Sequence, residues 1–267
     1  MTFLAASFFL VALLYSSVGF GGGSSYLAIL SIADLEYTEI PTVALLCNVA
    51  VTIAGSFNFL RHDHLSAKQI IPFLLGSIPM AFIFGAISVS QKTFFVTLGV
   101  ALALAGLILT FAPRNQRDQI NRSQFRFQTN CVIGLFIGAL AGLTGIGGGV
   151  YLSPILHLLS PIKPKSIAAL TTVFILLNST AALIGHSAKS FPFAGVSPEA
   201  WALVPCVFVG GVIGSFFGAS HRIASKRIIQ ITGFLTIIAG SRILWRELAN
   251  QHQSTSSRLI HSERIES

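Results

Sequence analysis

Two glycine-rich segments carry the clearest potential for chemistry in this sequence. Residues 19–23 read GFGGG and residues 145–149 read GIGGG, both inside apolar runs. Successive glycines interrupt a helix, because each costs about 1 kcal/mol relative to Ala. Unwound backbone exposes N–H groups, and a short helix that follows points the positive end of its dipole at the break. The pattern predicts an anion site made by Gly21, Gly22, Gly23, Gly147, Gly148 and Gly149.

Close helix packing through small residues is the alternative explanation of such glycines. Two breaks at matching points of two repeats favour the binding interpretation, since transporter sites are built in this way. A nucleotide-binding loop is excluded, because no Lys-Ser or Lys-Thr pair follows the glycines.

Uncharged polar residues near the breaks could complete the shell of an oxyanion. Ser24 follows the first break and Asn48 lies in the next apolar run, while its counterpart in the second half holds Thr171, Thr172 and Asn178. Hydrogen bonding between helices is the alternative role for each of these side chains. His62 and His186 end equivalent apolar runs and could carry a coupled proton, or could be interfacial residues.

Other chemistries have no support in the residues. The apolar runs contain no Asp or Glu, which cation and proton carriers usually keep at membrane depth. Cys47, Cys131 and Cys206 lack the spacing of metal ligands. We therefore expect no metal, no cofactor and no enzymatic activity.

The elements that must position these residues are membrane helices. Hydrophobic residues make up 53% of the chain and charged residues 10%, with a mean hydropathy of +0.76. Runs without Lys, Arg, Asp or Glu cover 2–20, 41–60, 69–91, 93–113, 127–162, 166–188, 200–221 and 228–241. About 20 residues of helix cross a hydrocarbon core of roughly 30 Å. The basic residues lie in loops and at the C-terminus, so the net charge of +8 does not indicate nucleic-acid binding.

The chain is an internal duplication. Residues 19–30 and 145–156 match at six of twelve positions without a gap. We expect a first repeat over 1–112, a basic cytoplasmic linker over 113–127, a second repeat over 128–247 and a disordered polar tail over 248–267. The predicted fold is an all-α, polytopic integral membrane bundle of about eight transmembrane helices. It consists of two tandem four-helix repeats, with the first helix of each interrupted at the glycines.

Two topologies fit this pattern. The segments after the glycines either belong to simple crossings or fold back as half-depth hairpins, which would invert the two halves. The distribution of Lys and Arg does not decide between them, and both place the 113–127 linker in the cytoplasm.

The paired motifs, the stretch Pro164 to Thr172, Asn178-Ser179 and Arg61-His62 resemble the TauE/SafE family of membrane permeases, also described as sulfite exporters. The resemblance covers roughly residues 3–247. It implies an eight-helix permease that moves sulfite, sulfonates or related organosulfur anions across the cytoplasmic membrane, with the lipid bilayer and a small anion as partners. A membrane scaffold or assembly subunit whose glycines serve only packing is the competing hypothesis.

Overall fold

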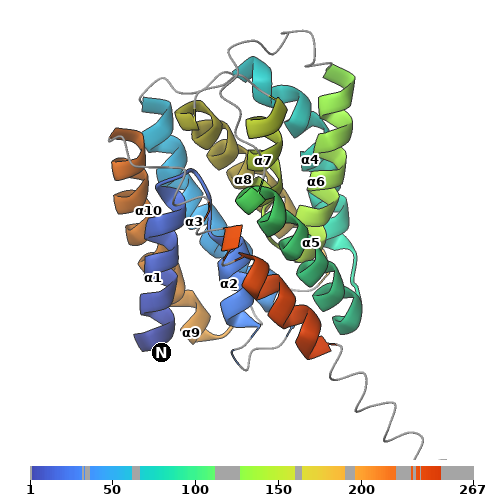
Figure 1. The fold of residues 1–267 in the computed structure, drawn as a ribbon. Coiled ribbons are helices and arrows are strands. Elements are labelled where there is room, and N and C mark those ends of the chain that lie inside the picture. The colour runs from blue at the N-terminus through green and yellow to red at the C-terminus, as the bar shows by residue number, and fades with distance from the viewer. Residues whose placement is uncertain are drawn as a thin grey trace, which may run out of the picture.

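The computed structural model describes residues 2–31, 33, 37–61, 67–111, 127–159, 164–189, 196–220, 230, 233–234 and 236–247. Every regular element in these residues is a helix (Figure 1). The helices are α1 (Thr2–Ser16), α2 (Gly23–Leu30), α3 (Ile40–Arg61), α4 (Ala67–Ala86), α5 (Gln91–Phe111), α6 (Phe127–Thr144), α7 (Gly149–Leu159), α8 (Pro164–Ser187), α9 (Pro198–Trp201), α10 (Leu203–Ser220) and a last helical stretch over 236–247.

Six of these helices are long and apolar enough to cross a membrane: α3, α4 over Gln69–Ala86, α5, α6, α8 and α10. Large apolar side chains such as Phe57, Phe111 and Phe136 face outward, as expected for a surface in contact with lipid. The six helices, together with α1 and the stretch 236–247, confirm the predicted polytopic helical membrane fold.

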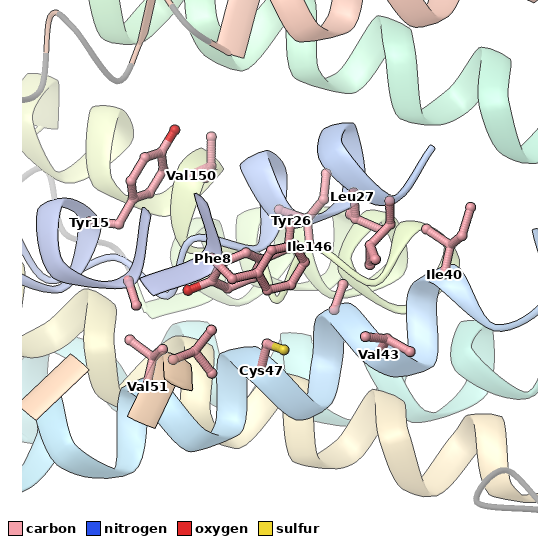
Figure 2. Packing of buried hydrophobic residues seen from close by; sticks show 14 of the residues in the cluster. Phe8, Tyr15, Tyr26, Leu27, Ile40, Val43, Cys47, Val51, Ile146 and Val150 are labelled. Atoms are coloured by element: carbon pink, nitrogen blue, oxygen red, sulfur yellow. The ribbon is translucent and has the colours of Figure 1, made fainter. Parts of the chain in front are cut away.

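The first glycine break turns the chain back on itself. The ring of Tyr26 on α2 stacks on Phe8 of α1 with centroids 4.6 Å apart, and Ser25 Oγ donates to Tyr15 Oη at 2.7 Å. Figure 2 shows the stacked rings, with Cys47 and Val51 of α3 alongside. Since residues on α2 contact α1 well before the break, α1 and α2 form a hairpin. At 1.5 Å per residue, the 15 residues of α1 are about 22 Å long, less than a full crossing.

The second break makes a matching hairpin. Leu152 and Leu156 on α7 pack in one cluster with Ile137 of α6, and Ile133 of α6 lies against that cluster. The chain therefore turns back after the glycines, and α7 packs mainly against α8. Each half thus begins with a helical hairpin bent at its glycine break.

The long helices that follow the hairpins run in opposite directions. Leu45, near the start of α3, packs with Ala181 and Ala182, near the end of α8. Phe59, near the end of α3, packs with Ala168, near the start of α8. The equivalent helices are antiparallel, so the two halves are inverted relative to each other. The structure thereby selects one of the two topologies that the sequence left open.

The next helix of each half packs against the opposite half. Helix α4 lies mainly against α6 and α8, and α10 lies mainly against α1 and α3. Glycines allow both contacts. Gly134, Gly138 and Gly142 of α6 meet the α4 backbone, Gly210 and Gly214 of α10 meet that of α1, and Gly218 meets Ser17, the residue after α1. Stripes of small residues let membrane helices approach closely where lipid offers no hydrophobic driving force. We call this arrangement the helix exchange.

The last helices of the two halves pair with each other. Gly99 of α5 lies against Leu244 and Gly240, and Gly106 of α5 lies against Ile237. Arg246 donates from Nη1 to the carbonyl of Ser31 at 2.6 Å, which ties the end of the stretch 236–247 to the residue after α2. This pair flanks the two hairpins and the crossing of α3 with α8 (Figure 1).

Candidate functional site

The glycine breaks have backbone conformations that other residues rarely adopt. Gly19 and Gly22 have φ of 84° and 90°, and Gly145, Gly147 and Gly148 have φ of 77°, 82° and 82°. A left-handed conformation costs an L-residue roughly 1–2 kcal/mol. The glycines are therefore required for the turns themselves, in addition to any close packing.

Both breaks leave backbone N–H groups without acceptors. Helix α2 begins at Gly23 without a side-chain cap, and α7 begins at Gly149. The first N–H groups of a helix have no partner within it. In the described part of the chain, the amides of Gly21 to Gly23 and Gly147 to Gly149 donate no backbone hydrogen bond. Two helix N-termini with unused donors thus face the centre of the protein.

Asn48 of α3 joins the two breaks. Its Nδ2 donates to the carbonyl of Ile146, in the second break, at 2.9 Å. A Cβ on Gly21 would lie 2.5 Å from Asn48 Oδ1, and one on Gly147 would lie 3.0 Å from Nδ2. The amide group therefore lies between backbone from both halves, and its Oδ1 is buried without a partner.

Thr172 of α8 makes the reciprocal connection. Its Oγ1 lies 3.0 Å from the carbonyl of Gly19, in the first break, and 2.8 Å from that of Ala168. The long helix of each half thus holds a carbonyl in the break of the other half. We call these two hydrogen bonds the crossed ties.

Further polar groups near the breaks are buried without partners. They include the hydroxyls of Ser24, Thr171 and Ser179 and the Oδ1 of Asn178. Thr171 lies beside Gly149, with 2.9 Å between its Cγ2 and a Cβ placed on the glycine. Asn178 donates from Nδ2 to Phe174 in its own helix at 2.9 Å. An unpartnered buried polar group is costly, so each of these groups needs a structural or functional explanation.

The structure brings together most of the residues predicted from the sequence. Gly21, Gly23, Gly147 and Gly149 lie around Asn48 and the nearby face of α8, Thr171 lies beside Gly149, and Thr172 holds the first break. Gly22 and Gly148 face away from this point, Gly22 toward Tyr26 and Gly148 toward Ile137 and Phe174. Sequence reasoning did not select Ile175, and it named Ser179 only as part of the Asn178-Ser179 motif. A Cβ on Gly147 would lie 2.5 Å from Ser179 Oγ and 3.0 Å from Ile175 Cγ2. Both residues follow Thr171 at helical spacing on α8, which is the signal that could have found them.

The structure describes one of the two histidines predicted for proton coupling. His186 is buried near the end of α8, with its Nε2 3.3 Å from the carbonyl of Gly142 on α6. This contact links two helices, and proton coupling by His186 stays a prediction. His62 lies outside the described residues.

The architecture defines the class of protein. Inverted repeats with broken helices that meet near the centre are the design of membrane transporters, whose substrate sites lie at such breaks. The sequence profile of the family described as sulfite exporter TauE/SafE matches residues 4–243, and the chain belongs to this family.

Curated relatives agree with this class. A probable membrane transporter protein, y4hK, from Sinorhizobium fredii is 29% identical over 250 residues, which are 91% of this chain and 97% of the relative. The probable membrane transporter protein YjnA from Bacillus subtilis is 36% identical over 118 residues, which are 42% of this chain and 45% of the relative. No solved structure gives a significant match. The protein is therefore a multi-pass membrane transporter.

Proposed function

We propose that the protein moves small anions, sulfite or related organosulfur anions, across the cytoplasmic membrane, with export favoured. The observation that carries this proposal is the meeting of two glycine breaks, each with unused N–H groups, around Asn48. Such groups bind anions without a buried cation, because the positive helix ends point at them.

In this proposal the anion binds to donors from both halves. The amides of Gly21 to Gly23 and Gly147 to Gly149 hold its oxygens, and Ser24, Asn48, Thr171, Thr172 and Asn178 supply side-chain donors. The crossed ties currently use the donors of Asn48 and Thr172. Binding would exchange these bonds for bonds to substrate, which links occupancy of the site to movement of the breaks.

The substrate class rests on the family description, which names sulfite. The direction rests on a physical argument. Moving one negative charge through 100 mV changes the free energy by about 2.3 kcal/mol, and a negative cell interior favours its exit. The sequence offers no nucleotide-binding motif, so we propose that the ion gradients or the substrate gradient drive transport.

Flux in proteoliposomes tests the proposal. Purified protein is reconstituted, and uptake of labelled sulfite is measured with and without an imposed pH gradient. We expect saturable uptake. Absence of uptake of sulfite, thiosulfate and methanesulfonate by demonstrably folded protein would remove the proposed substrate class. His186→Gln, measured in the same gradients, tests proton coupling, because the amide can still reach the Gly142 carbonyl but cannot carry a proton.

A scaffold without transport is the competing function, and it needs a discriminating variant that leaves the fold intact. A bulky residue at Gly148 does not discriminate. Gly148 has φ of 82°, and a Cβ there would lie 2.9 Å from Ile137 and Phe174, so Gly148→Leu would damage the fold under either hypothesis. Removing an unpartnered hydroxyl, as at Thr171, is the cleaner test.

A further inference from the structure

Ile175 on α8 is buried in surroundings unlike those of the other apolar side chains. Only 2% of its surface is exposed. Its neighbours Leu170 and Phe174 join an apolar cluster with Ile137 and Leu152, but Ile175 belongs to no such cluster. Among the described residues, it is the one buried hydrophobic side chain larger than alanine for which this is true. The neighbours that bury it therefore lie outside the apolar clusters.

Glycines of both breaks surround this side chain. A Cβ on Gly21 would lie 3.2 Å from Ile175 Cγ2, and one on Gly147 would lie 3.0 Å from the same atom. A Cβ on Gly149 would overlap Cγ1 and Cδ1. The isoleucine thus occupies the space that three missing side chains leave between the two halves.

Polar groups lie on both sides of Ile175 along the helix. Thr171 is one turn before it and Ser179 one turn after it, and both hydroxyls are buried without partners. A single apolar side chain therefore interrupts a column of unused polar groups, at the level where the breaks meet. An apolar constriction blocks ions by excluding water, without needing any charge.

We propose that Ile175 is the barrier that closes the anion path between the two halves and limits the size of the anion that passes. This inference rests on the proposed transport of anions. The branched Cβ of Ile175 restricts rotation about χ1, so a change of rotamer alone does not open the barrier. The barrier opens when α8 and the breaks move apart. The smallest change to the barrier is loss of Cδ1, the atom nearest to where a Cβ on Gly149 would lie.

Two substitutions that give side chains of nearly equal volume separate the effect of side-chain size from the effect of excluding water. Ile175→Val removes Cδ1. Ile175→Thr removes Cδ1 as well and has a hydroxyl in place of Cγ1. The matched controls are Ile184→Val and Ile184→Thr, because Ile184 is on the same helix with 56% of its surface exposed. The probes are labelled sulfite and a series from methanesulfonate to butanesulfonate, with flux measured in proteoliposomes.

We expect Ile175→Val to raise the rate of the larger sulfonates relative to sulfite by about tenfold, the effect of one methylene in a tight apolar site. Ile175→Thr should let anions leak across the bilayer when no opposing ion gradient is imposed. The Ile184 variants should match the wild type. Unchanged selectivity and leak in folded Ile175 variants of a transporting protein would overturn the inference. Absence of flux in wild type would instead count against the proposed function.

A second measurement tests the barrier without transport. In a background with Cys47, Cys131 and Cys206 replaced by Ala, single cysteines at 171, 175 and 179 are exposed to a membrane-impermeant thiol reagent from each side. We expect position 175 to react more slowly than both flanking positions. Equal reactivity at all three positions would contradict a dry barrier at Ile175.

Discussion

At the scale of single residues, Thr171 gives the sharpest test of the site. Its hydroxyl is buried without a partner, which costs a folded protein about 1–3 kcal/mol. Thr171→Val keeps the shape and removes that cost, so we expect the thermal midpoint to stay or rise. If the hydroxyl binds substrate, flux should fall about tenfold, the equivalent of one hydrogen bond.

Thr180→Val is the control for this prediction, because Thr180 lies on the same helix, is exposed and bonds only within α8. Flux and melting are measured on both variants. Unchanged flux in Thr171→Val would remove this residue from the substrate site and favour a purely structural role for the cluster.

Gly147 tests the need for left-handed backbone. Its φ is 82°, and a Cβ would lie 2.5 Å from Ser179 Oγ. We expect Gly147→Ala to lower stability by more than the roughly 1–2 kcal/mol of the backbone conformation alone. Adding Ser179→Ala should restore only the part of the lost stability that the contact with Ser179 Oγ causes. Denaturation of the single and double variants measures both parts, and full rescue would show that backbone strain is negligible.

The sequence predicted the site residues unevenly, for physical reasons. The glycines were visible because three in succession contradict helix formation, and Asn48 and Thr171 because polar groups are costly in lipid. Ile175 was missed although it follows Thr171 at helical spacing, because an isoleucine in an apolar run has no distinct role until its neighbours prove to be glycines. Contacts between distant segments, which sequence spacing does not encode, give it a distinct role.

At the scale of helices, the small-residue stripe of α6 should determine assembly with α4. A Cβ on Gly138 would overlap the backbone of Ser77. We expect Gly138→Ile to force the helices apart and to cause loss of folded protein in a fluorescence size-exclusion assay. Val132→Ile, on the exposed face of α6, should leave the elution profile unchanged. A folded, monodisperse Gly138→Ile protein would show that this contact is dispensable.

The helices themselves were predictable, but their hairpins were not. Long apolar runs require helices, because lipid leaves backbone groups no other partners. Hydropathy does not distinguish a segment that crosses from one that turns back, and α2 is as apolar as its neighbours. The stacking of Tyr26 on Phe8 decides the matter, and it becomes visible only once the chain is folded.

At the scale of the whole molecule, the helix exchange predicts that neither half is stable alone. Helix α4 finds its main contacts on α6 and α8, and α10 finds its own on α1 and α3. Residues 1–112 or 113–267 expressed separately should be degraded, whereas the two co-expressed should purify together. Membrane fractions from the three cultures, probed for a tag on each half, make the comparison. A stable single half would show that the exchange is not required for folding.

The inversion of the two halves has a consequence for any shorter chain of this kind. One half contains a single break, a single long central helix and only one side of the helix exchange. A protein of half the length could form the same pair of breaks only with a second copy of itself inserted in the bilayer in the opposite orientation. Such a chain would need loops whose positive charges do not favour one orientation. Joining two copies removes that requirement, because the first half can then fix the orientation of both.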